Sequence, residues 1–175
     1  IQIMSKFPQI QAIEIDSLDH YFGRYKKPYL QKRDNLNLYI AAKKGKLVKE
    51  APLAYGLGHE PHYYYVHAYN CIYECDYCYL QGYFHSPDIV FFVNHDDILS
   101  EMENVIRQHP KDQAVWFHAG EYSDSLALSH LTNELSLYFD FFKKHPNAYL
   151  ELRTKSVNIR SLIEIGPINN VVVSF

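Results

Sequence analysis

Three cysteines packed into eight residues constrain this chain more than any other feature of its sequence. They are Cys71, Cys75 and Cys78, the only cysteines among the 175 residues, and their spacing is C-x3-C-x2-C. A four-iron four-sulfur (4Fe-4S) cluster normally takes four cysteine ligands, so a compact set of three leaves one iron open to another chelator. The sequence therefore predicts a cluster with one open iron.

Two other uses of the cysteines stand beside this prediction. Disulfide bonds are disfavoured, because three crowded cysteines are an odd number and form no framework for a chain of this length. A zinc site is the stronger alternative, since Zn2+ accepts three cysteines and one histidine at similar spacings. His67 or His85 could supply the fourth ligand. The spacing favours the cluster but leaves zinc open.

The composition is that of one globular domain with a sizeable core. Hydrophobic residues make up 47% of the chain and charged residues 21%, which argues against a disordered chain or a coiled coil. No stretch has the apolar length of a membrane span, and the first six residues lack the pattern of a signal peptide. We therefore expect no membrane partner and a cytoplasmic protein, because free thiols need a reducing compartment.

Charge is unevenly distributed along the chain. The net charge is −3, but residues 20–50 hold nine lysines and arginines against two acidic residues. Such a basic segment could bind phosphate groups or another polyanion, DNA included. A solvated lysine-rich surface explains the same pattern and is the commoner case.

Residues 1–60 predict a small appended region. Residues 12–16 alternate apolar and polar side chains, which is the pattern of a short strand. A second strand is predicted over 36–42, and a turn at 43–46 leads back into an apolar pair. This arrangement predicts a hairpin.

From residue 61 the pattern changes to alternating strands and helices, which is typical of parallel strands with right-handed crossovers. Strands are predicted over 63–68, 114–119, 148–154 and 171–175, and helices over 94–109, 128–144 and 159–165. The expected fold class is α/β: residues 61–175 would form the first part of a partial (β/α) barrel, truncated after about four parallel strands. An apolar parallel strand needs neighbours on both sides, so we expect the chain to be a fragment.

The residues around the last two cysteines resemble a known family. Tyr77 completes C-x3-C-x-aromatic-C, which resembles the signature of radical S-adenosylmethionine (radical SAM) enzymes. The longer run Cys75–Gln81 is similar to that of spore photoproduct lyases, radical SAM enzymes that repair a thymine dimer in spore DNA. Shorter similarities follow at Val93–Ile98, Ser123–Asp124, His130–Thr132, Thr154–Lys155 and Ser174.

The resemblance implies two cofactors and the residues that bind them. Cys71, Cys75 and Cys78 would hold the 4Fe-4S cluster, and the amino and carboxylate groups of SAM would chelate its open iron. One electron, from a reductant such as flavodoxin or ferredoxin, would cleave SAM to a 5′-deoxyadenosyl radical. Tyr77 would lie beside the adenine, and Lys155 would bind the methionine carboxylate.

Further SAM contacts implied by the resemblance lie at or near the C-terminal ends of the predicted strands. They are Ser123, Asp124 and Ser174, and Gly120-Glu121 resembles the G-E element with which many other radical SAM proteins bind the SAM amino group. Taken singly, each has a structural explanation, such as a helix-capping turn or a strand hydroxyl with a local partner. Their shared position at the ends of parallel strands, where barrel enzymes assemble their sites, favours a functional explanation for the set.

One position departs from the family pattern. Spore photoproduct lyases have a hydrogen-donating cysteine two residues before the Ser-Asp pair, and here that residue is Glu121. Tyr79, which matches the tyrosine that works with that cysteine, is retained and is the catalytic candidate. The resemblance implies a lyase acting on a DNA lesion. The alternatives are radical SAM chemistry on another substrate, which Glu121 favours, and a non-enzymatic zinc or electron-transfer module.

Overall fold

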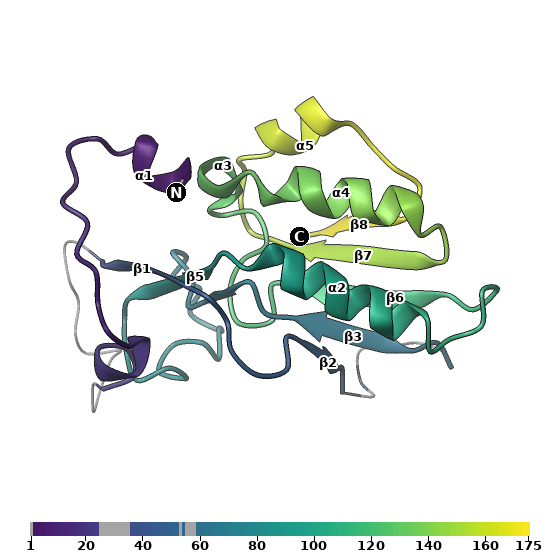
Figure 1. Ribbon diagram of the computed structural model, residues 1–175, viewed down its shortest axis with the longest axis horizontal. Coiled ribbons are helices and arrows are strands. Elements are labelled where there is room, and N and C mark those ends of the chain that lie inside the picture. Colours follow the sequence, from purple (N-terminus) through teal and green to yellow (C-terminus); the bar gives the residue numbers. More distant parts are fainter. Residues whose placement is uncertain (1, 25–35, 53, 55–58) are drawn as a thin grey trace.

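The computed structural model of the protein describes residues 2–24, 36–52, 54 and 59–175. Within these residues, a larger sheet has the strand order β2-β3-β6-β7-β8 (Figure 1). Its strands are Val48–Glu50 (β2), His62–Tyr65 (β3), Val115–Ala119 (β6), Ala148–Arg153 (β7) and Val171–Ser174 (β8). The last four run parallel, and β2 is antiparallel to β3 at one edge.

Helices gather on one face of this sheet (Figure 1). They are His95–Ile106 (α2), Glu134–Lys144 (α4) and Arg160–Ile165 (α5). Met102 of α2 and Phe142 of α4 are completely buried against the strands, as are alternate residues of β7 such as Leu150. Truncating a buried phenylalanine such as Phe142 to alanine typically costs about 3–5 kcal/mol. The residues between the buried ones of β7 therefore point to the opposite face, which no helix of the described residues covers.

A smaller sheet has the order β1-β5-β4 and lies beside the larger one (Figure 1). Its strands are Leu38–Ala41 (β1), Ala68–Tyr69 (β4) and Ile89–Phe92 (β5). β1 runs parallel to β5, and β4 runs antiparallel to it. The short remaining elements are Gln2–Ser5 (α1), Leu18–His20 (a 3-10 turn) and Ser129–Thr132 (α3). Among the described residues, no helix is both long and apolar enough to span a bilayer.

The predicted alternation after residue 61 is confirmed. All four predicted parallel strands and all three helical regions form, and they give a mixed α/β fold. The strand predicted over 63–68 is shorter than expected, because it ends at Tyr65 and Ala68 belongs to a strand of the smaller sheet. Asn94 directly precedes α2, but its side chain makes no capping bond to the helix backbone. Instead its Oδ1 accepts the Lys43 amide at 2.8 Å, and its amide donates to the Lys43 carbonyl at 3.1 Å.

These contacts explain why the predicted hairpin is wrong. Asn94 ties the chain after β1 to the end of β5, so β1 joins the smaller sheet while β2 joins the larger one. β5 was not predicted, although its apolar run of four residues is buried throughout. Both strands of the N-terminal region thus pair with strands from beyond residue 61, and the boundary at residue 60 stays a prediction.

Two further predictions are corrected. Residues 12–16 form no strand, and Ile13 is 76% exposed, because the alternating segment finds no neighbouring strand to pair with. The helix expected over 128–144 is divided into α3 and α4 at Asn133, whose left-handed backbone (φ 59°) interrupts the helical hydrogen bonds. Part of the basic segment, residues 25–35, lies outside the described residues.

Candidate cluster and cofactor site

The cysteine loop runs from Asn70 to Ser86, between β4 and β5, and its two ends are tied together. Asn70 has a left-handed backbone with φ of 63°, which asparagine tolerates better than most residues. Its buried side-chain amide donates hydrogen bonds to the carbonyl oxygens of Ser86 (2.7 Å) and Asp88 (2.6 Å). Protein contacts alone therefore close the base of the loop.

The three thiols are free, half-buried side chains of this loop. The Cys78 amide and the Gln81 side chain both donate to the Cys75 carbonyl, at 2.9 and 2.6 Å. Burial raises the pKa of the Cys71 thiol to about 11, and the Asp124 carboxylate adds a smaller increase. A metal centre would have to displace this proton, because thiolates are the ligands. A set of three thiols in one closed loop fits a 4Fe-4S cluster with an open iron.

The histidines considered as zinc ligands differ in their surroundings. His67 is 5% exposed, and burial lowers its pKa to about 4. His85 lies on the exposed side of the cysteine loop. In the part of the chain that the structure describes, no three His, Cys, Asp or Glu side chains converge on one metal-ion position. The same holds for the three cysteines, so the cluster and the zinc site both rest on the spacing of the cysteines in one loop rather than on a preformed ligand set.

Tyrosines attach the cysteine loop to the segment that follows β6. The Tyr79 hydroxyl donates a hydrogen bond to the carbonyl oxygen of Glu121. Tyr83 stacks on Tyr122 with ring centroids 5.5 Å apart, and Phe84 packs edge-on against the same ring at 5.7 Å. Such aromatic pairs contribute about 0.5–1.5 kcal/mol each beyond the burial of area. The segments predicted to bind the cluster and SAM are thus in direct contact.

Gly120 begins that segment at a point where only glycine fits. Its φ is 83°, and a Cβ would lie 2.8 Å from Ser125 Oγ and 3.1 Å from the Arg153 carbonyl oxygen. The Ser125 amide donates to the same carbonyl at 3.0 Å. The segment after β6 therefore turns back onto the end of β7, which brings it to Lys155.

Asp124 holds these two strand ends together. It is 7% exposed, and its Oδ1 accepts hydrogen bonds from Leu126 and Ala127 amides and from Thr154 Oγ1, at 2.7–2.9 Å. Its Oδ2 accepts the Lys155 amide at 2.6 Å. A carboxylate offers about four acceptor sites, so these bonds occupy most of its capacity. The geometry therefore favours a positioning role for Asp124.

The other residues predicted to bind SAM lie around the same edge. Lys155 lies two residues after the end of β7 and is exposed, and Glu121 and Ser123 are half-buried in the segment after β6. Ser174 ends β8, where its carbonyl accepts the Thr154 amide at 2.9 Å. Tyr77, on the cysteine loop, is 77% exposed.

Three buried ionisable groups lie behind the segment after β6. Glu134 is 4% exposed and, with Ser123 and His67, lines a small cavity there. Burial raises the pKa of Glu134 to about 8. Burial also lowers the pKa of His95 to about 4, as it does for His67. All three groups are therefore held in their uncharged forms near neutral pH.

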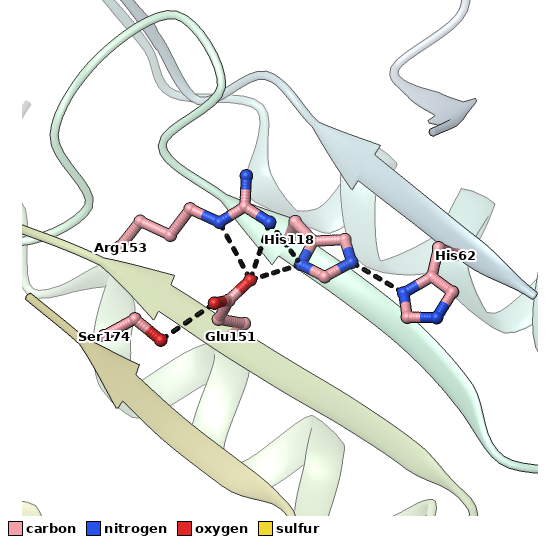
Figure 2. A network of polar contacts seen from close by, with 5 residues as sticks. All are labelled: His62, His118, Glu151, Arg153 and Ser174. Carbon is pink, nitrogen blue, oxygen red and sulfur yellow. Dashed lines mark hydrogen bonds and ion pairs between the residues drawn. The ribbon is translucent and has the colours of Figure 1, made fainter. Parts of the chain in front are cut away.

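A polar network on the helix-free face of the larger sheet was not predicted (Figure 2). Its centre is Glu151, which contacts His118, Arg153 and Ser174, and His118 in turn contacts His62. The hydrogen bond from His118 is the main cause that lowers the pKa of Glu151 to about 2; bonds from Arg153 and Ser174 also lower it, and burial opposes them. The signal in the sequence was the alternation A-Y-L-E-L-R in β7, because a parallel strand covered on both faces is usually apolar throughout.

A family model described as spore photoproduct lyase matches residues 26–172. The chain belongs to the spore photoproduct lyase family. The resemblance seen in the cysteine loop is thereby confirmed, and the match extends from the first sheet strand into β8. No match to a curated protein was found.

Solved structures of spore photoproduct lyases share this fold. A tyrosine-to-phenylalanine mutant matches with 23% identity and a TM-score of 0.67, over 78% of this chain and 38% of its own. The lyase complexed with dinucleoside spore photoproduct matches with 23% identity and a TM-score of 0.66, over the same shares of the two chains. A double mutant with bound AdoMet and dinucleoside spore photoproduct matches with 21% identity and a TM-score of 0.64, over 83% of this chain and 45% of its own. The chain thus spans less than half the length of these lyases.

Proposed function

We propose that this chain carries the cofactor-binding part of a radical SAM lyase, with the 4Fe-4S cluster held by Cys71, Cys75 and Cys78. The observation that carries the proposal is the bond from Tyr79 to Glu121, which joins the cysteine loop to the strand ends. Cofactor and substrate sites assemble at the carboxyl ends of parallel barrel strands. On this proposal the four parallel strands belong to a partial barrel.

When bound, the cluster would supply the electron for the reductive cleavage of SAM to a 5′-deoxyadenosyl radical. Flavodoxin or ferredoxin would be the reductant, in a reducing cytoplasm. Lys155 binds the methionine carboxylate through a charge-assisted bond, and Asp124 fixes the backbone of Lys155. The remaining SAM contacts come from Tyr77, Gly120, Glu121, Ser123 and Ser174.

The substrate that we propose is a DNA lesion of the spore photoproduct class. Three of the similar lyase structures hold dinucleoside spore photoproduct. In that reaction Tyr79 would be the catalytic residue. A second candidate, radical SAM chemistry on a different substrate, is favoured by Glu121. A carboxylate has no hydrogen atom to give to a product radical, unlike the thiol at this position of the family.

Anaerobic reconstitution tests the cluster. We expect about four irons per chain, because three thiolates with one open iron fit a 4Fe-4S cluster. The reduced protein should show an electron paramagnetic resonance signal that changes when SAM is added. A Cys75→Ala variant should lose the signal, whereas replacing the exposed Asp76 beside it by Ala should not. Stoichiometric zinc without iron uptake would instead support the zinc module.

A further inference from the structure

Glu151 connects three neighbouring strands through one carboxylate. Its Oε2 contacts His118 Nδ1 of β6 at 2.5 Å and accepts a bond from Arg153 Nε of β7 at 2.8 Å. Its Oε1 accepts the Ser174 hydroxyl of β8 at 2.8 Å. Figure 2 shows the two oxygens turned to these different partners. One side chain therefore links the middle of the sheet to the end of β8.

The directions of these bonds follow from the chemistry of the partners. An ionised carboxylate only accepts, so the contact at 2.5 Å requires a proton on His118 Nδ1. Arg153 Nη2, which can only donate, lies 3.1 Å from the same nitrogen and donates instead to Glu151 Oε2 at 2.8 Å. In neutral His118, Nε2 is then an acceptor and receives the proton of His62 Nδ1, 2.9 Å away. Ser174 must likewise point its only hydrogen at Glu151. The Ser174 oxygen keeps lone pairs for a ligand but has no proton left to donate.

We infer that Glu151 is a positioning residue that makes the Ser174 hydroxyl a hydrogen-bond acceptor towards a donor group of SAM, a hydroxyl or an amino group. The inference rests on the proposed function, in which Ser174 contacts SAM. Glu151 lies one strand away and does not need to touch the cofactor. Its two other partners, His118 and Arg153, hold the carboxylate so that Oε1 faces Ser174.

The Glu151→Gln substitution keeps a side chain of similar size at position 151 but reverses the direction of its hydrogen bond with Ser174. The amide oxygen of Gln would stay with the donors His118 and Arg153, so the amide NH2 would face Ser174 and donate to it. The Ser174 proton would then point at the cofactor, where a donor would meet a donor. We expect SAM affinity of the reconstituted protein, measured by equilibrium titration, to fall about tenfold. The matched variant Glu164→Gln removes an exposed carboxylate of α5, 62% exposed and paired with Arg160, and should leave affinity unchanged.

A double-mutant cycle separates positioning from general damage to the sheet. Ser174→Ala should weaken SAM binding to a similar degree, and adding Glu151→Gln to it should change affinity less than threefold further. Equal effects of Glu151→Gln with and without the serine hydroxyl would overturn the inference. Wild-type affinity in Glu151→Gln would overturn it as well.

A second pair of variants keeps the test decisive if Glu151→Gln does not fold. Ser174→Thr and Ser174→Val have the same shape, and β-branched residues suit a strand. Thr keeps the hydroxyl on Glu151 and should bind SAM within threefold of wild type, whereas Val should bind about tenfold more weakly. Equal binding by Thr and Val would refute the inference. Failure of the wild-type, cluster-loaded protein to bind SAM would instead refute the proposed function, on which the inference depends.

Discussion

A hydrogen bond holds the backbone of Lys155 in place, whereas its exposed side chain is available to bind a ligand. Its amide is bonded to Asp124 at 2.6 Å while its ammonium group lies on the exposed surface. We expect Lys155→Ala to weaken SAM binding about ten- to hundredfold with iron content unchanged, since a charge-assisted bond is worth about 1.5–3 kcal/mol. Titration of the reconstituted protein with SAM measures this. Lys111→Ala, at an exposed turn after α2, is the control, and equal affinity of both variants would contradict the assignment.

Glu121 is fixed through its carbonyl oxygen, which accepts the Tyr79 hydroxyl. An ionised carboxylate here can accept hydrogen bonds from the SAM ammonium group. We therefore expect Glu121→Ala to weaken SAM binding about tenfold in the same titration. The unaltered protein should cleave SAM reductively and yet repair spore photoproduct poorly, and Glu121→Cys should raise repair. Efficient repair by the wild type, with SAM affinity indifferent to Glu121→Ala, would show that this role is wrong.

The turn after β6 requires a residue without a side chain at position 120. An alanine there meets Ser125 Oγ at 2.8 Å and must keep a positive φ. We expect Gly120→Ala to lower the free energy of unfolding by about 2–4 kcal/mol, from left-handed strain and the close contact together, as measured by urea denaturation. Gly45→Ala is the matched control, because Gly45 has φ of 76° with open space around it. It should cost about 1–2 kcal/mol. Equal losses would show that the close approach is unimportant.

At the scale of the whole molecule, buried groups set the pH dependence of stability. Burial lowers the pKa of His67 and His95 from 6.5 to about 4, so unfolding takes up two protons just below pH 6.5. Burial raises the pKa of Glu134 from 4.5 to about 8, so unfolding releases one proton between these values. The net uptake of one proton makes stability fall from pH 6.5 to 4.5, by about 1.4 kcal/mol per pH unit. From pH 6.5 to 8 the release from Glu134 makes stability fall as pH rises.

We therefore expect maximal stability near the ordinary pKa of histidine, at about pH 6.5. Urea denaturation across pH 4.5–8 measures the profile. In the variant Glu134→Gln, stability should no longer fall from pH 6.5 to 8, and it should fall more steeply below pH 6.5, because proton release from Glu134 no longer offsets proton uptake by the histidines. An alkaline fall that persists in this variant would contradict the assignment to Glu134.

Features that depend on neighbouring residues along the chain could be predicted from the sequence. Cysteine spacing gives the compact ligand set, and the periods of two and 3.6 residues give the strands and helices after residue 61. The partners of β1 and β2 could not be predicted, because strand pairing depends on contacts between distant segments. Here Asn94, about fifty residues away, ties the end of β1 to β5. The division of the predicted helix at Asn133 could not be predicted either, because it depends on the backbone conformation of this residue and not on apolar periodicity.

The hydrogen-bond partners of the predicted site residues could be seen only in the folded structure. Ser123, Asp124 and Lys155 were expected from the resemblance, but only the fold turns the Asp124 carboxylate inward to hold the ends of β6 and β7. The Glu151 network joins three strands whose contacts depend on register, which sequence periodicity does not specify. Successive side chains of a strand point to opposite faces of the sheet, so the sequence alone shows which polar residues share a face. Its hydrogen-bond partner is chosen by the neighbouring strands, and these meet only when the chain folds.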